Sequence, residues 1–267
     1  DLLADKEINI VLNLTTPQAH YEIIKKTLLA GKHSYCEKPL STNYEHGAEL
    51  LQLANDNNLY IGNAPDTFLG GGSQLARQLI DQNEIGDVKL GVVNFAFPGV
   101  QSFHPDPESW FKKGGGPVID MGPYYFTALV NLLGPAKCVR ATATKVHDYR
   151  TIATGLKKGD KFEVEIPTSI IGSIEFNSSA VIQIFLSFDV INHQRNHIEL
   201  YGTKGSMIVP DPNMFGGSVF SSYSESGEWK EYSSSNMLIG KKNIFNKSVR
   251  SNEQSEVANY RGVGLSE

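Results

Sequence analysis

The chain is poor in cysteine and in long apolar runs. Its 267 residues include only Cys36 and Cys138, which stand alone and lack the spacing of a metal site or a redox pair. We therefore predict no metal ligands and expect a reducing, cytoplasmic location. No apolar run approaches the roughly 18 residues that a membrane-spanning helix needs, which excludes membrane-protein classes built on such helices.

The chain also lacks a strong charge of either sign. It carries 24 basic and 29 acidic residues, for a net charge of -5, without a long like-charged run. This balance excludes the basic footprint expected of proteins that bind nucleic acid or anionic membranes. With about 40% hydrophobic residues the chain can bury a sizeable core. Small molecules are therefore the expected partners.

A third absence is the dinucleotide-binding fingerprint Gly-x-Gly-x-x-Gly. The glycine runs 70–72 and 114–116 do not have its spacing. A Rossmann domain uses this loop after its first strand to place the pyrophosphate at a helix N-terminus. Either the protein binds no dinucleotide, or the chain starts after the first strands of such a domain.

The first part of the chain nevertheless has the pattern of an α/β fold. Apolar and β-branched residues predict buried strands at 8–15, 33–37 and 59–62, and helices are predicted after Thr16 and over 41–57. Strands that alternate with helices are typical of a parallel sheet with right-handed crossovers. Residues 1–65 therefore resemble half of a doubly wound domain.

From about residue 88 the strands alternate polar and apolar residues, which is typical of a mostly antiparallel sheet. Strands are predicted at 89–97, 138–147, 170–177, 181–189 and 197–201, with one helix over 118–133 and a hairpin and loops from 212 to 235. We expect a second domain over 66–267. The overall class is then α/β followed by α+β.

Lys38 is the first candidate for chemistry. It follows the strand 33–37, and open α/β sheets bind ligands beyond the carboxyl ends of their strands. Pro39 restricts the backbone of Lys38, favours an extended geometry and permits a cis peptide bond. The alternative is a solvated lysine at a strand end.

Two motifs extend this interpretation. The segment from Thr16-Pro17 to Glu37-Lys38-Pro39-Leu40, and the segment Gly115 to Tyr124 with the sequence GGPVIDMGPY, resemble the two signatures of the Gfo/Idh/MocA oxidoreductases, the glucose-fructose oxidoreductase and inositol dehydrogenase family. The resemblance covers nearly the whole chain. It implies the second half of a Rossmann domain followed by an open-sheet substrate domain. It also implies that the glycine-rich loop lies upstream of Asp1, that the chain lacks a C-terminal part, and that these 267 residues alone are inactive.

The resemblance implies an enzyme that uses NAD or NADP to transfer a hydride to or from a sugar, polyol or related hydroxy compound. Lys38 and Tyr124 would share the proton transfer, with Asp120 orienting the substrate hydroxyl. Tyr124 stands where the family most often has histidine. A non-catalytic sugar or redox sensor, or an assembly scaffold, remains the alternative. A homodimer or homotetramer formed through the C-terminal sheet is also implied.

The resemblance further implies a set of residues that border the cofactor. For His20 a packed position on the helix surface is the alternative. The implied cofactor-binding residues are Thr15, Thr16, Pro17, His20, Glu37, Lys38, Pro39 and Trp110.

Overall fold

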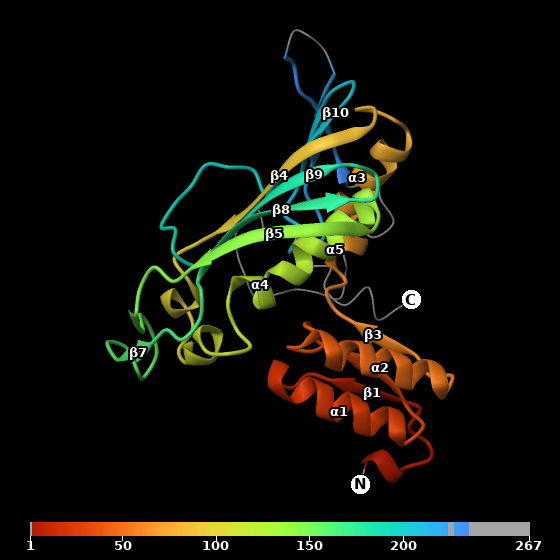
Figure 1. Ribbon diagram of the computed structural model, residues 1–267, viewed down its shortest axis with the longest axis vertical. Helices are drawn as coiled ribbons and strands as arrows, with labels where there is room; N and C mark the ends of the chain where they lie inside the picture. The colour runs from red at the N-terminus through yellow and green to blue at the C-terminus, as the bar shows by residue number, and fades with distance from the viewer. Residues whose placement is uncertain (1, 224–226, 235–267) are drawn as a thin grey trace. The chain divides into compact units, whose positions relative to one another are not determined.

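The computed structural model describes residues 2–223 and 227–234 and divides the chain into two compact units, Asp1–Pro65 and Asp66–Glu267 (Figure 1). Among the described residues, no helix has the length and apolar character to cross a membrane.

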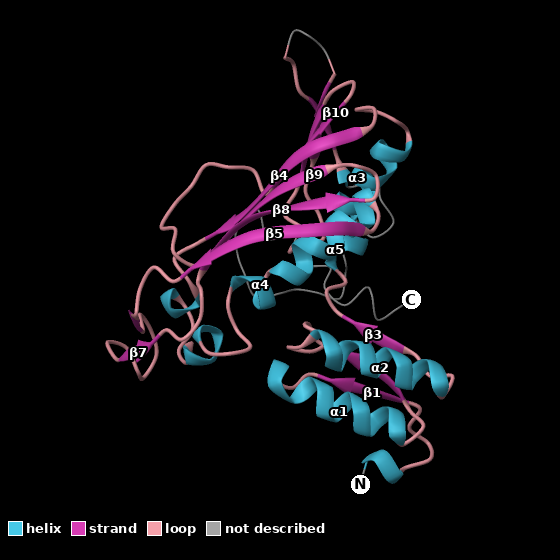
Figure 2. Ribbon diagram, in the orientation of Figure 1, coloured by secondary structure: helices cyan, strands magenta, loops and turns pink. Residues whose placement is uncertain are grey.

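The first unit is a three-stranded parallel sheet in the order β1-β2-β3, with a helix in each crossover (Figure 2). This confirms the predicted α/β pattern. Its elements are η1 Leu2–Ala4, β1 Ile10–Asn13, α1 Pro17–Leu29, β2 His33–Cys36, α2 Tyr44–Asp56 and β3 Ile61–Asn63.

The helices of this unit begin and end where local chemistry dictates. Pro17 starts α1, where its missing amide hydrogen costs nothing, and Gly31 follows its end with a φ of 72°. α2 begins at Tyr44 because the Asn43 side chain caps the amide of His46. The core of this unit consists of Ile24, Leu28, Cys36, Leu50 and Ala54.

The prediction that the first strand is buried throughout is wrong. Ile10, Leu12 and Leu14 are 61%, 48% and 65% exposed, whereas Asn13 is buried. Side chains alternate between the two faces of a strand, and the described helices of this unit bury only one face of β1. The apolar run therefore marks a strand with one open face.

The second unit contains an eight-stranded sheet in the order β13-β12-β11-β10-β4-β9-β8-β5, in which only the β4/β9 pair is parallel (Figure 2). This confirms the mostly antiparallel prediction. A small sheet of β6 and β7, which the sequence pattern did not predict, lies apart from it. The strands are β4 Val88–Ala96, β5 Ala136–Thr144, β6 Tyr149–Thr151, β7 Lys161–Glu163, β8 Ser169–Phe176, β9 Val181–Ser187, β10 Ile198–Gly202, β11 Ser206–Val209, β12 Val219–Ser222 and β13 Lys230–Tyr232.

The predicted hairpin region from 212 to 235 contains β12 and β13, which pair antiparallel. Residues 224–226 and 235 lie outside the described part of the chain. The helices of the second unit are η2 Thr67–Leu69, α3 Gly71–Asp81, η3 Val100–Ser102, η4 Glu108–Phe111, α4 Pro117–Asp120 and α5 Gly122–Leu133.

The predicted helix over 118–133 is two helices, α4 and α5, which meet at Met121. Pro123 explains the break, because proline inside a helix has no amide hydrogen to donate and its ring clashes with the preceding turn. Asp120 and Tyr124 therefore do not share one continuous helix face.

Helix α3 was missed because its sequence opens on glycines. Gly72 donates its amide hydrogen to the carbonyl of Phe215 at 3.2 Å. A Cβ atom at Gly70 would lie 2.2 Å from that same carbonyl oxygen. These glycines permit close packing of two backbones, which gives them a structural role.

Candidate functional site

The carboxyl edge of the first unit's sheet is organised by Asn13, the last residue of β1. Its side-chain oxygen accepts hydrogen bonds from the Thr15 amide at 3.2 Å and the Thr15 hydroxyl at 2.7 Å. These bonds shape the turn into α1. Thr16 is the N-cap residue of α1, but its side chain makes no capping hydrogen bond. Both threonines are exposed at this turn.

The turn after β2 lies at the same carboxyl edge of the sheet and is bonded to β1. The Glu37 amide donates to the Asn13 carbonyl at 3.0 Å, and the Glu37 carboxylate accepts from the Lys38 amide at 3.0 Å. Lys38 is half-buried, and the Lys38–Pro39 peptide bond is cis, as the proline geometry allowed. The backbone around Lys38 is therefore held by one bond to β1 and by one bond within its own turn.

Asn63 at the end of β3 completes this arrangement. Its side-chain amide donates to the carbonyls of Cys36 and Glu37 at 3.1 and 3.0 Å. Asn63 was not among the residues predicted from the sequence. The available signal was an asparagine at the carboxyl end of a parallel strand, the same position that Asn13 holds in β1.

His20 links the two turns. Its side chain is 0% exposed, with Nδ1 2.6 Å from the Pro39 carbonyl oxygen and Nε2 3.0 Å from that of Thr15. His20 therefore lies inside the fold and not on the helix surface, and its place beside the cofactor stays a prediction. The first unit thus brings together all the predicted cofactor-binding residues that it contains, from Thr15 to His20 and from Glu37 to Pro39.

In the second unit, the structure ties Trp110 to the segment of Asp120 and Tyr124. The Gly116 amide donates to the Trp110 carbonyl at 2.7 Å, and the Asp120 amide donates to the Gly116 carbonyl at 2.9 Å. The Trp110 ring lies 4.7 Å from that of His104. Tyr124 is 8% exposed and packs in the hydrophobic core of this unit, and Asp120 is half-buried.

A polar cluster in the second unit was not found from sequence. The Tyr125 hydroxyl lies 2.8 Å from His197 Nδ1 and donates to Asp211 at 3.0 Å. Burial and the neighbouring Asp211 charge raise the pKa of Tyr125 well above its ordinary value. The members are 72 and 86 residues apart, so no local pattern reveals the cluster.

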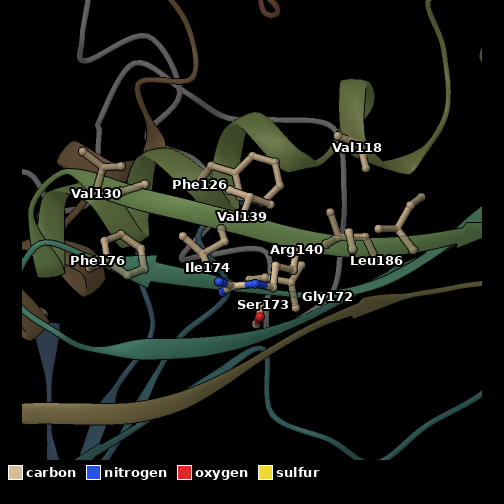
Figure 3. Close-up of a pocket in the computed structure, with 14 residues that line it drawn as sticks. Val118, Phe126, Val130, Val139, Arg140, Gly172, Ser173, Ile174, Phe176 and Leu186 are labelled. Carbon is tan, nitrogen blue, oxygen red and sulfur yellow. The ribbon is translucent and has the colours of Figure 1, made fainter.

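The second unit also contains an apolar cavity of about 310 Å³. In Figure 3, Phe126 and Val130 of α5 lie across from sheet residues such as Val139 and Ile174. A sugar needs directed hydrogen bonds, which these apolar walls do not supply. We therefore do not assign a sugar substrate to this cavity. Within the described ranges, no group of three or more His, Cys, Asp and Glu side chains is placed to hold a metal ion.

The two units have the architecture of an NAD-binding oxidoreductase. Residues 1–63 match the model of the oxidoreductase family with an NAD-binding Rossmann fold, and residues 73–208 match that of the GFO/IDH/MocA C-terminal domain. The chain belongs to the Gfo/Idh/MocA family, as the two sequence motifs predicted.

Curated relatives include dTDP-3,4-didehydro-2,6-dideoxy-alpha-D-glucose 3-reductase of Saccharopolyspora spinosa, which is 28% identical over 78% of this chain and 57% of its own length. D-xylose dehydrogenase of Paenarthrobacter nicotinovorans is 26% identical over 77% of this chain and 55% of its own length. The chain thus spans a little more than half the length of these relatives.

Among solved structures, an NAD binding oxidoreductase from Klebsiella pneumoniae has the same fold, with a TM-score of 0.76 and 22% identity over 90% of this chain and 64% of that one. Levoglucosan dehydrogenase in complex with NADH and levoglucosan gives a TM-score of 0.71 and 20% identity over 87% of this chain and 62% of that one. At these identities the likeness concerns the fold.

Proposed function

We propose that the full-length protein transfers a hydride between the nicotinamide of NAD or NADP and a carbon that bears a hydroxyl group in a sugar, polyol or related compound. The main support is the position of Lys38, directly beyond β2 at the carboxyl edge of a parallel sheet, in a family of NAD-binding oxidoreductases. Relatives named for D-xylose and levoglucosan support sugars as the substrate class.

The residues at this edge fit part of a dinucleotide site. α1 presents its N-terminal amides, which favour an anionic group, at an exposed turn that Thr16 does not cap. Thr15, Thr16 and Pro17 would lie along the cofactor, with Glu37 near its ribose. The glycine-rich loop that would hold the pyrophosphate is not in this sequence. In the second unit, Trp110 would border the nicotinamide.

The bound cofactor supplies the hydride acceptor or donor. In our proposal, the proton of the reacting hydroxyl passes into a relay shared by Lys38, as the neutral amine, and Tyr124, as the phenolate, while the Asp120 carboxylate orients the substrate hydroxyl without taking this proton. A well-placed general base contributes roughly 10²- to 10⁴-fold to the rate.

The test uses full-length protein, both cofactors and a panel of sugars and polyols, followed at the absorbance band of reduced nicotinamide. We expect Lys38→Ala and Tyr124→Phe each to lower kcat by roughly 10²- to 10⁴-fold. Lys26→Ala in the last turn of α1, at the opposite edge of the sheet, is a matched control. Wild-type turnover in both variants would contradict the assignment. Binding of cofactor and sugar without turnover would favour a sensor instead.

We further propose that the face of the large sheet opposite its buried core joins a second copy of the chain. Leu90, Val181 and Ile171 lie on this face and are 56%, 40% and 57% exposed. Leu90 lies directly beside Val181, and Ile171 lies four residues further along the neighbouring strand β8. Large apolar side chains exposed on one face of a sheet are typical of a subunit interface. Leu90→Glu should shift a homodimer or homotetramer to monomer in sedimentation analysis. An unchanged mass would refute this surface.

A further inference from the structure

We infer that His20 is a positioning residue, which acts by clamping the Thr15 turn to the Lys38–Pro39 turn through backbone carbonyls. Its ring nitrogens lie 2.6 Å from the Pro39 oxygen and 3.0 Å from the Thr15 oxygen, and the side chain is 0% exposed. The effect on turnover rests on the proposed function, but the clamp itself does not.

The chemistry of the contacts makes the clamp specific to histidine. A carbonyl oxygen only accepts hydrogen bonds, so each ring nitrogen must carry a hydrogen to bond its partner. A ring with one hydrogen makes one of the two bonds, and a ring with two makes both. His20 has the length and the two separated nitrogens to span both turns.

The position of the clamp ties it to Lys38. Pro39 is buried and cannot donate a backbone hydrogen bond, so its carbonyl is the polar backbone group available to anchor this residue. On the other side, Asn13 already orders the Thr15 turn through the Thr15 amide and hydroxyl. His20 lies against the remaining Thr15 carbonyl, and thereby joins two turns that are distant in sequence, at Thr15 and at Pro39.

His20 could either contact the cofactor or position the residues that do. A residue that contacts the cofactor presents its ring to solvent or ligand, whereas the His20 ring faces protein carbonyls and is fully buried. His20 would therefore set where Thr15, Glu37 and Lys38 lie without touching the cofactor itself.

A first experiment needs no activity. Amide hydrogen exchange is measured in the full-length protein and in His20→Leu, which removes both donors but keeps an apolar body. The Lys38 and Glu37 amides should exchange roughly tenfold faster, since one hydrogen bond contributes about that factor. Helix α2 should be unaffected. Unchanged exchange in both turns of a folded His20→Leu protein would overturn the clamp.

His46 provides the matched control in the same unit. It stacks on Tyr21 with ring centroids 3.9 Å apart, and it bonds neither turn. His46→Leu should leave exchange at Lys38 unchanged. His20→Gln retains one donor and should restore part of the protection. If His20→Leu does not fold, the same comparison is made with His20→Gln alone, where unaltered exchange at Lys38 counts against the clamp.

A second experiment tests the catalytic consequence. If His20 acts through Lys38, His20→Leu should lower kcat about tenfold in the wild-type background but have little further effect beside Lys38→Ala. Equal losses in both backgrounds would show that His20 acts independently of Lys38. Absence of any wild-type activity would refute the proposed function, while the exchange data would still decide the clamp.

Discussion

The buried ion pair of Arg150 and Asp189 gives the sharpest stability prediction. The two side chains are 8% and 5% exposed. Arg150 also donates to the Pro98 and Phe188 carbonyls, at 2.7 and 2.9 Å, and lies over the ring of Phe111. Removing one partner of such a pair leaves a buried charge without its counter-charge. We therefore expect Arg150→Met to lower the free energy of unfolding by about 3 to 5 kcal/mol.

The other hydrogen-bond partners of Asp189 affect how much stability the Arg150→Met change removes. Asp189 would keep a hydrogen bond from the Thr168 hydroxyl at 2.7 Å, and another from Ser169. These donors compensate the carboxylate only in part. Burial already lowers the pKa of Arg150, although the Asp189 charge opposes that shift. The Nε atom of Arg150 also has no hydrogen-bond partner among the described residues. The cost of the single change should nevertheless exceed that of losing the whole pair.

The assay is denaturant unfolding followed by tryptophan fluorescence. Both tryptophans, Trp110 and Trp229, belong to the second unit, so the signal reports the unit that contains the pair. Asp189→Asn added to Arg150→Met should recover part of the loss, since it removes the unpaired charge. Lys137→Met breaks an exposed pair and should have a much smaller effect. A loss below about 1 kcal/mol in Arg150→Met would falsify this reasoning.

Three further experiments test other parts of the structure. Because burial and Asp211 raise the pKa of Tyr125, the folded state keeps this proton when the unfolded state loses it above about pH 10. Stability should therefore fall as the pH rises beyond that value, and Tyr125→Phe should reduce this slope in alkaline denaturation while costing about 2 kcal/mol at neutral pH. Burial raises the pKa of Cys36 to about 12, so a thiol reagent should label the partly exposed Cys138 first, and equal rates would contradict the burial. Gly70→Ala should lower the free energy of unfolding by about 1 to 3 kcal/mol, seen as a lower melting temperature, because the added methyl group would overlap the neighbouring carbonyl.

The sequence predicted the elements that periodicity specifies. The strand expected at 33–37 is β2 at His33–Cys36, and that at 181–189 is β9 at Val181–Ser187. It failed where a neighbour distant along the chain decides the outcome. The packing role of Gly70 and Gly72 at the start of α3 is evident only from their contacts with Phe215. The open face of β1 depends on which helices cover the sheet.

In the candidate site too, local patterns predict some features, and neighbours distant along the chain decide the others. Strand ends and helix starts follow from local patterns, and these placed Thr15, Lys38 and Pro39 at one edge of one sheet. The hydrogen bonds that hold these residues in place could not be predicted from local sequence patterns. His20 reaches a carbonyl 19 residues away, and Asn63 reaches one 27 residues away, because parallel strands bring remote turns together.

The outermost position of β5 has a consequence for solubility. This nine-residue strand is paired only with β8 in the described sheet, and an unpaired strand edge is a template on which other chains can grow. Lys137 and Arg140 place two cations along it. Lys137 is paired with Glu175, so Arg140 carries the uncompensated charge of the two toward an approaching copy. Like charges repel when identical edges approach, and this repulsion opposes edge-to-edge pairing.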